Sequence, residues 1–70
     1  MQVTVNGETR EIRVDSIATL LDITSKIEET LPQGKFIMEV ALNGKNLDHQ
    51  WYQSADKVYV LNEDTLDLKV

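Results

Sequence analysis

Hydrophobic and polar residues alternate at the start of the chain. Val3 and Val5 are apolar between polar neighbours, and the alternation returns in residues 10–14, after Asn6-Gly7. A period of two residues is the pattern of a β-strand with one buried face. Asn and Gly both tolerate the positive φ angles that tight hairpin turns require. The pattern predicts a β-hairpin around Asn6-Gly7, with a loop longer than two residues.

The spacing of apolar residues then changes to that of a helix. Asp15 or Ser16 can cap its start, because a short side-chain oxygen accepts a hydrogen bond from a free backbone N–H. Pro32 and Gly34 mark its end. Residues 25–28 also match a capping box, so a break or kink there is an alternative. The core-facing positions of this predicted helix are Ile17, Leu20, Leu21, Thr24, Ile27 and Leu31.

The second half of the chain contains further alternating segments. Residues 36–42 predict a strand that ends at Asn43-Gly44, with Met38, Val40 and Leu42 on one face and Ile37, Glu39 and Ala41 on the other. Residues 58–61 form a short apolar segment. In residues 65–70 the apolar positions are Leu66, Leu68 and Val70, which predicts a final strand with one buried face.

The order of these elements is hairpin, helix and then two or three strands. A single helix can cover one face of a mixed sheet, which indicates an α+β domain of two layers. We expect a β-grasp (ubiquitin-like) fold spanning residues 1–70, with four or five strands and the helix on one face. The first and last strands would be neighbours, which places Leu66, Leu68 and Val70 beside Val3 and Val5, under Ile17, Leu20, Leu21 and Ile27. A different α+β roll with the same element order is the alternative.

Composition limits the chemistry that the chain can perform. Seventy residues suit one domain. The absence of cysteine excludes disulfides, zinc–thiolate sites and thiol catalysis, and it fits a reducing compartment. The first residues lack a basic and an apolar region, so they do not form a signal peptide. The apolar runs are too short to span a membrane. We therefore expect a cytoplasmic protein.

The charge of the chain is acidic. Twelve Asp and Glu residues against seven Lys and Arg residues give a net charge of −5. Phosphate backbones repel such a surface, so we expect no nucleic-acid partner. Acidity favours solubility and steers a protein toward basic protein surfaces. We expect a monomer with a protein partner, no membrane partner and no cofactor.

Two segments carry a resemblance to a known family. "VALNGKNLDHQW", residues 40–51, resembles the strand–turn–strand segment of the small sulfur carriers of thiamin biosynthesis, and "LNEDTLDLKV" resembles their closing strand. The opening "MQVTVNGETREIRV" and the segment "IATLLDI" are also similar. The most specific piece is Ala41-Leu42-Asn43-Gly44 with Trp51. The chain is thus similar to the ThiS-like and MoaD-like sulfur-carrier family of ubiquitin-like β-grasp proteins.

The resemblance implies chemistry at a carboxyl end. Sulfur carriers act through a flexible Gly-Gly tail, whose carboxylate an activating enzyme adenylates before it becomes a thiocarboxylate. Glycine suits this task because a bare backbone fits a narrow tunnel. Residues 67–70 are instead Asp-Leu-Lys-Val, and the three glycines lie at expected turns. No catalytic residue of the family can therefore be transferred to this chain.

Two functions follow from that difference. The preferred hypothesis is a small non-catalytic, sulfur-carrier-like protein that acts as a protein-interaction module. The alternative is a sulfur carrier of thiamin or molybdopterin type biosynthesis whose Gly-Gly tail is absent from this chain. In both, the partner is a protein, such as an activating-enzyme-like or biosynthetic protein.

No side-chain cluster predicts catalysis or metal binding. His49 is the only histidine, and Glu28-Glu29 and Glu63-Asp64 are more simply a helix surface and a turn. A small catalytic domain is therefore the weakest of the functions considered. We expect no catalytic residue, no cofactor-binding residue and no metal ligand.

Protein binding is the remaining expectation, on the sheet face away from the helix. Trp51 and Tyr52 are large aromatic residues in a polar stretch, where Trp51 suits packing and Tyr52 suits a contact. The outer face would be mostly polar, and the alternative to a docking surface is an ordinary solvated face on which charges such as Lys69 are paired across strands. The candidate protein-binding residues are Phe36, Ile37, Ala41, Trp51, Tyr52, Arg13 and Lys69.

Overall fold

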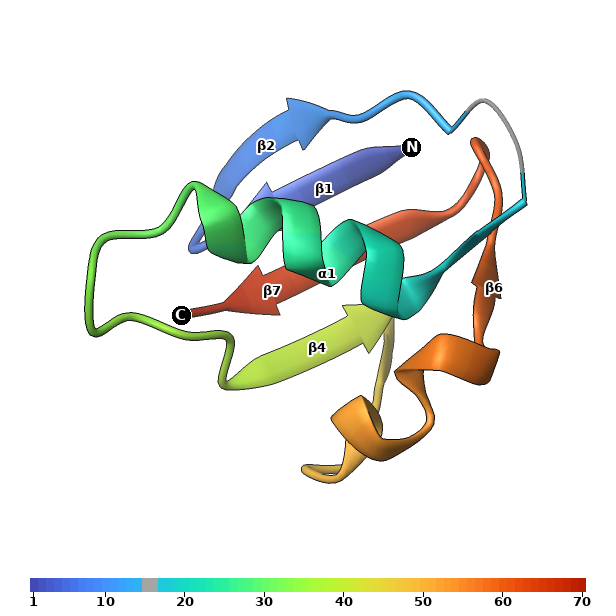
Figure 1. Cartoon of the computed structure of the whole chain (residues 1–70). Coiled ribbons are helices and arrows are strands. Elements are labelled where there is room, and N and C mark those ends of the chain that lie inside the picture. The colour runs from blue at the N-terminus through green and yellow to red at the C-terminus, as the bar shows by residue number, and fades with distance from the viewer. Residues whose placement is uncertain (15–16) are drawn as a thin grey trace.

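The computed structural model describes residues 1–14 and 17–70 and contains a sheet crossed by a helix (Figure 1). Five strands form this sheet in the order β2-β1-β7-β4-β5. β1 and β7 are parallel neighbours, and the other pairs are antiparallel. The strands are β1 (Gln2–Val5), β2 (Glu8–Glu11), β4 (Glu39–Leu42), β5 (Lys45–Asn46) and β7 (Thr65–Lys69). This topology confirms the predicted β-grasp fold.

The first hairpin is tighter than predicted. Val5 pairs with Glu8, so the loop between β1 and β2 consists of Asn6 and Gly7 alone. Their φ angles are 49° and 86°, as a type I′ turn requires. The expectation of a longer loop was wrong, because Asn6 accepts a left-handed conformation and the turn needs no additional residue. β2 ends at Glu11, so residues 12–14, which the alternation placed in the second strand, lie outside it.

The helix α1 (Leu20–Glu29) begins later than predicted. Ala18 and Thr19 form the short strand β3 (Ala18–Thr19), paired with β6 (Tyr59–Val60), and this pairing keeps them extended. Thr19 then caps the helix, because its Oγ1 accepts from the Asp22 N–H at 3.3 Å and Asp22 Oδ2 accepts from the Thr19 N–H at 2.9 Å. The predicted capping residues, Asp15 and Ser16, lie outside the described residues.

Two predicted core positions of the helix were also wrong, and the alternative of a break is not observed. Ile17 precedes β3 and is 84% exposed, so it does not cover the sheet. Leu21 is on the solvent side of α1 and is exposed. The helix is continuous through Ser25, because its hydrogen-bonded turns extend to Glu29 without a break. Thr24 is buried as predicted, and its hydroxyl donates to the Leu20 carbonyl at 2.9 Å.

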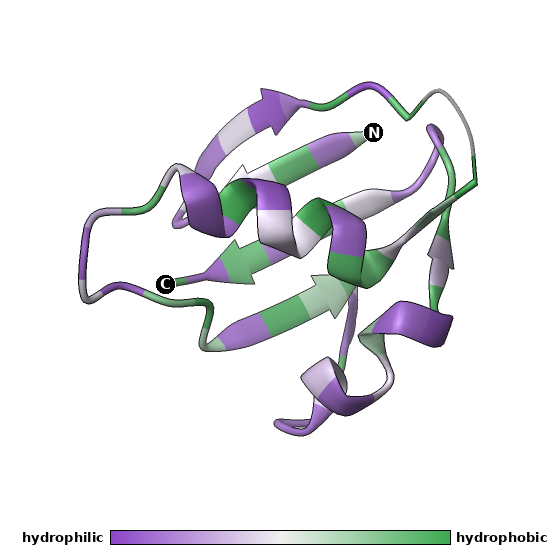
Figure 2. Ribbon diagram, viewed as in Figure 1, coloured by the Kyte–Doolittle hydropathy of each residue, from purple (hydrophilic) through white to green (hydrophobic). Residues whose placement is uncertain are grey.

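The core lies between α1 and one face of the sheet. Figure 2 shows apolar and polar segments alternating along β1, β7 and β4 where α1 crosses them. Each fully buried aliphatic side chain contributes about 1.5–3 kcal/mol relative to an exposed one. The buried aliphatic positions on the five-stranded sheet are Val3, Val5, Val40, Leu66 and Leu68, and those on the helix are Leu20, Ile23 and Ile27.

The segment before β4 departs from the predicted alternation. Because β4 begins only at Glu39, Ile37 and Met38 are not part of the strand. Ile37 packs into the core at 7% exposure, whereas Met38 is 64% exposed. The predicted face assignment of these two residues was therefore wrong, although Val40 and Glu39 lie on the faces that the pattern indicates.

The chain between β5 and β6 contains two short 3₁₀ turns, η1 (Trp51–Gln53) and η2 (Ala55–Lys57). Trp51 and Ala55 are buried and belong to the core cluster. Leu20 N–H donates to the Val58 carbonyl at 2.7 Å, which ties the start of α1 to this segment. These turns close the side of the core beside β3 and β6.

Candidate functional site at the carboxyl end of the sheet

Three separate parts of the chain meet where β7 ends. They are the β1–β2 turn, the last residues of β7 and the segment that precedes β4, which lie together in Figure 1 at the end marked C. Asn6 N–H donates to the Leu68 carbonyl at 3.0 Å, and Met38 N–H donates to the Lys69 carbonyl at 2.7 Å. Backbone contacts on both sides therefore fix this end of the sheet.

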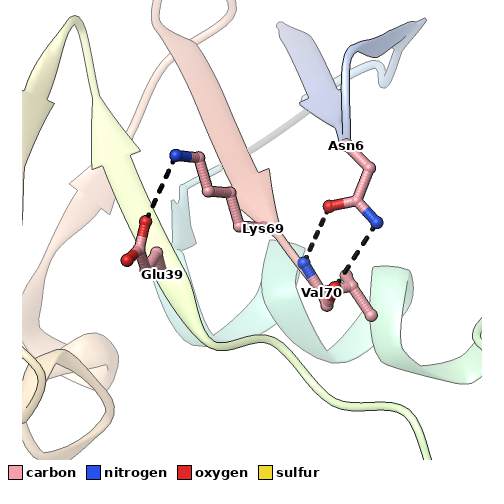
Figure 3. Close-up of polar contacts among 4 residues, drawn as sticks. All are labelled: Asn6, Glu39, Lys69 and Val70. Carbon is pink, nitrogen blue, oxygen red and sulfur yellow. Dashed lines mark hydrogen bonds and ion pairs between the residues drawn. The ribbon is translucent and has the colours of Figure 1, made fainter.

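Asn6 also binds Val70, one residue beyond the end of β7. The Val70 N–H donates to Asn6 Oδ1 at 2.9 Å, and Asn6 Nδ2 donates to the Val70 carbonyl at 3.5 Å (Figure 3). The shorter contact is a strong hydrogen bond, and the longer one is at the limit of the usual range. A side chain in the turn thus holds both backbone polar groups of Val70.

The β4 side of the same end carries a pair of charges. Lys69 Nζ lies 3.5 Å from Glu39 Oε2, and the two residues are opposite each other in the β4–β7 ladder (Figure 3). Both side chains are exposed, so the pair contributes about 0–1 kcal/mol to stability. The pair agrees with the alternative in which Lys69 belongs to an ordinary solvated face with charges paired across strands.

Two exposed apolar side chains lie in the segment that borders this end. Phe36 is 65% exposed and Met38 is 64% exposed. Met38 is held in place by its backbone bond to Lys69, so its side chain stays close to the carboxyl end of β7. An exposed aromatic residue and an exposed methionine are typical of protein contact surfaces.

The candidate protein-binding residues are divided among several elements, although Ala41 and Lys69 line one hollow on the outer face. Phe36 and Lys69 belong to the carboxyl end of the sheet. Ala41 is half-buried on the outer face. Arg13 is exposed and lines a hollow beside Met1, where β1 begins. Tyr52 is 60% exposed on η1.

Two of the seven candidates are unsuited to a contact because they are buried. Ile37 is a core residue, so the expectation that it lies on the outer face was wrong. Trp51 is 9% exposed, which confirms the expectation that it serves packing. The ring of Tyr52 stands edge-on to it, with centroids 6.2 Å apart and planes at 85°. The aromatic pair therefore divides into a packing residue and an exposed residue.

At the opposite end of β7, Asn43 and Asp64 organise the turn before the strand. Asn43 Nδ2 donates to Asp64 Oδ1 at 3.0 Å, and the Leu61 N–H donates to Asp64 Oδ2 at 2.8 Å. These bonds, chiefly the one from Asn43, lower the pKa of the Asp64 carboxyl below its ordinary value. Asp64 therefore remains a charged acceptor at neutral pH, which suits a structural role in the turn.

Asn6 and Met38 were missed as site residues by sequence reasoning. Asn6 was recognised as a turn residue, and Met38 was assigned to the buried face of a strand. The signal for Asn6 was present in the Asn-Gly dipeptide, but its bond partner is 64 positions away in the sequence. Only the pairing of β1 with β7 brings the two residues together.

Within residues 1–14 and 17–70, no group of three or more His, Asp or Glu side chains is arranged to hold a metal ion. His49 is an exposed residue of the segment before η1. None of the helices in the described part of the chain is long and apolar enough to cross a membrane.

Comparison with solved structures finds proteins of similar fold. No protein-family model matches the chain. No curated protein matches it either. The crystal structure of a thiamine biosynthesis protein (ThiS) from Geobacter metallireducens is similar, with 22% sequence identity and a TM-score of 0.60 over 97% of this chain and 90% of that chain.

A second solved structure gives the same result. It is the NMR solution structure of a thiamine biosynthesis protein from Geobacter metallireducens, with 22% identity and a TM-score of 0.58 over 97% of this chain and 80% of that chain. The chain therefore has a ThiS-like β-grasp fold, as the sequence resemblance predicted.

Proposed function

We propose that the chain is a ThiS-like sulfur-carrier protein of the thiamin or molybdopterin type whose Gly-Gly tail is absent from this chain, a small non-catalytic protein that a partner enzyme would modify on that tail. The observation that supports it best is the location of that end. β7 is paired on both sides, and its last residues are anchored between the β1–β2 turn and the segment before β4. A tail that followed Val70 would therefore extend from a rigid body, which a partner enzyme could hold while it modifies the tail.

The enzyme would dock on the side chains that surround the carboxyl end. Phe36 and Met38 supply exposed apolar area there, and Glu39 and Lys69 supply charge on the adjacent outer face. The net charge of −5 favours a partner with a basic surface around its cleft. A protein with an apolar pocket and a basic rim fits this end of the sheet.

Mass spectrometry after an activation reaction tests the function. Two versions are compared, the chain as it stands and the chain extended by two glycines after Val70. Each is incubated with a carrier-activating enzyme of the thiamin or molybdopterin pathway, ATP and sulfide. We expect the extended version to gain mass equal to exchange of one carboxyl oxygen for sulfur, and the version ending in Val70 to remain unchanged. Absence of the gain in both would reject the sulfur-carrier function.

The docking surface has its own control. Replacing Phe36 and Met38 by serine should weaken binding to the activating enzyme, because the exposed apolar area at the carboxyl end is lost. Tyr59→Ser removes a side chain that is as exposed as Met38 but lies on β6. Equal loss of affinity in the two variants, measured by calorimetry, would show that the docking surface is elsewhere.

A protein-interaction module without carboxyl-terminal chemistry is the second candidate. The observation in its favour is the number of large apolar side chains that are exposed across the described chain: Ile17, Leu21, Phe36, Met38, Tyr52, Tyr59 and Leu61. Such a module would bind its partner with no change in mass. The activation reaction therefore separates the two functions, since binding without sulfur gain supports the module.

A further inference from the structure

An asparagine from an Asn-Gly turn binds each end of β7. At the start, Asn43 Oδ1 accepts from the Thr65 N–H at 2.8 Å, and the Asn43 N–H donates to the Thr65 carbonyl at 2.8 Å. At the other end, the carboxamide of Asn6 binds Val70. Thr65 lies inside the strand, whereas Val70 lies beyond it. Asn6 therefore holds a residue that the regular ladder does not include.

The register explains why a side chain is needed there. The β1–β7 pairing ends at Val5 and Leu68, because the chain turns away from β7 at Asn6. A carboxamide carries the same donor and acceptor as a peptide unit. The side chain of Asn6 therefore makes the hydrogen bonds to Val70 that the backbone would make if β1 continued. On the other side, the Met38 N–H binds the Lys69 carbonyl. The peptide unit between Lys69 and Val70 is thus held from both neighbouring segments.

We propose that Asn6 is a positioning residue for the carboxyl end of β7, which fixes where and in which direction the chain leaves the sheet at Val70. This inference rests on the proposed carrier function. In that function a carboxylate oxygen of the Gly-Gly tail attacks the α-phosphorus of ATP, and the bond to pyrophosphate breaks as pyrophosphate leaves. Sulfide then attacks the acyl carbon, a proton is released, and AMP leaves as the carbon–sulfur bond forms.

The benefit of the anchor is geometric. An activating enzyme holds ATP at a fixed place relative to the docked carrier body. If Val70 is fixed, a tail that follows it has few conformations available. If Val70 is free, the tail has more conformations and loses more conformational entropy when it binds at the α-phosphate of ATP. Displacement of a reacting group by about 1 Å can cost about a hundredfold in rate. Loss of the anchor should therefore affect the rate of activation more than the binding of the carrier.

The test measures steady-state pyrophosphate release from ATP by the carrier-activating enzyme in the presence of sulfide, with the Gly-Gly-extended chain as substrate. Asn6→Gly keeps a residue that accepts the positive φ of the turn and removes the side-chain anchor. We expect its kcat to fall about tenfold or more, with a KM close to that of the parent, because Phe36 and Met38 are intact. Asn43→Gly makes the same change in the other Asn-Gly turn and should leave kcat and KM unchanged.

A second variant and a spectroscopic measurement guard against a general loss of structure. Asn6→Asp keeps an acceptor for the Val70 N–H and loses the donor, so its kcat should lie between the parent and Asn6→Gly. Hydrogen exchange of the Val70 amide, followed by NMR, should accelerate in Asn6→Gly and remain slow in Asn43→Gly. These two measurements connect any change of rate to the anchor itself.

The outcomes distinguish this inference from the function on which it rests. Equal kcat values for the parent and Asn6→Gly would overturn the positioning role while the carrier function stands. A fall in kcat without faster exchange at Val70 would also overturn it. Failure of the parent itself to release pyrophosphate would reject the carrier function, and the positioning role with it.

Discussion

The two Asn-Gly turns are nearly identical in backbone and different in what their asparagines bind. Asn6 and Gly7 have φ angles of 49° and 86°, and Asn43 and Gly44 have φ angles of 52° and 82°. Both turns join antiparallel strands that flank β7 on opposite sides. Asn43 binds the beginning of β7 and the Asp64 carboxylate, whereas Asn6 binds beyond the end of β7.

This difference shows that a single turn sequence can serve two purposes. The dipeptide determines the backbone of the turn, and the neighbouring strand determines what the asparagine side chain meets. At Asn43 the side chain stabilises a turn that is internal to the fold. At Asn6 the side chain binds Val70, the residue that follows β7. Stability and rate measurements at both turns can separate these roles.

The largest expected effect is the loss of stability when a core leucine is removed from either end of β7. Leu66 and Leu68 are buried in the core, near the Asn43 and Asn6 ends respectively. We expect Leu66→Ala and Leu68→Ala each to lower the free energy of unfolding by about 2–5 kcal/mol, because each leaves a cavity. Urea denaturation measures both. A cost below about 1 kcal/mol at either end would mean that this end of the core is loosely packed.

The next effect compares the glycines of the turns. Added Cβ atoms at Gly7 and Gly44 would meet no atom within 4 Å, so the cost of alanine comes from the positive φ alone. We expect Gly7→Ala and Gly44→Ala each to destabilise the protein by about 1–2 kcal/mol, and by similar amounts. Thermal unfolding gives the comparison. A clearly larger cost at one turn would contradict the equivalence of the two backbones.

Replacement of Asn43 should lower the stability more than replacement of Asn6, whereas replacement of Asn6 should lower the rate of activation more. Asn43→Gly loses bonds to the Thr65 N–H and to a charged carboxylate, at about 1–3 kcal/mol, whereas Asn6→Gly loses one short and one long bond, at about 1 kcal/mol. Urea denaturation should therefore rank Asn43→Gly as the less stable variant. A larger loss of stability for Asn6→Gly than for Asn43→Gly would contradict this ranking, because a fall in kcat at Asn6 could then reflect lost stability.

The smallest effect is a pH dependence confined to the Asn43 turn. The hydrogen bonds from Asn43 and Leu61 lower the folded pKa of Asp64 below the ordinary value of 3.8. Its contribution to stability is therefore present above the unfolded pKa and is lost as the pH falls through the folded pKa. Asp64→Asn should flatten the loss of stability in acid, measured by urea denaturation between pH about 2 and about 6. Glu63→Gln is the control, and an equal flattening there would contradict the assignment.

Much of the fold could be predicted because its signals are local. The alternation of Leu66 and Leu68, and of Val3 and Val5, predicts strands with one buried face, and Thr24 is a core position of the helix as its spacing predicts. Ile17 shows the limit of this reasoning. It has the correct helical spacing, but the strand pairing of β3 with β6 delays the helix and leaves Ile17 exposed.

The candidate site was less predictable because it depends on contacts between distant segments. The sequence identifies Asn6 as a turn residue, but the register that brings Val70 to its side chain is a property of the assembled sheet. Phe36 and Lys69 were predicted as exposed candidates and are exposed at the carboxyl end. Ile37 was misassigned because the alternation of β4 does not extend back to it.

The parallel pairing of β1 and β7 has a mechanical consequence. Residue 1 and residue 70 are at opposite ends of two adjacent strands that run in the same direction (Figure 1). A pulling force applied between them acts along the strands, so the hydrogen bonds of the β1–β7 ladder share the load and must break together. Strands pulled from the same end would instead separate one bond at a time. The parallel β1–β7 pairing therefore resists a force between residues 1 and 70 better than a pairing pulled from one end would.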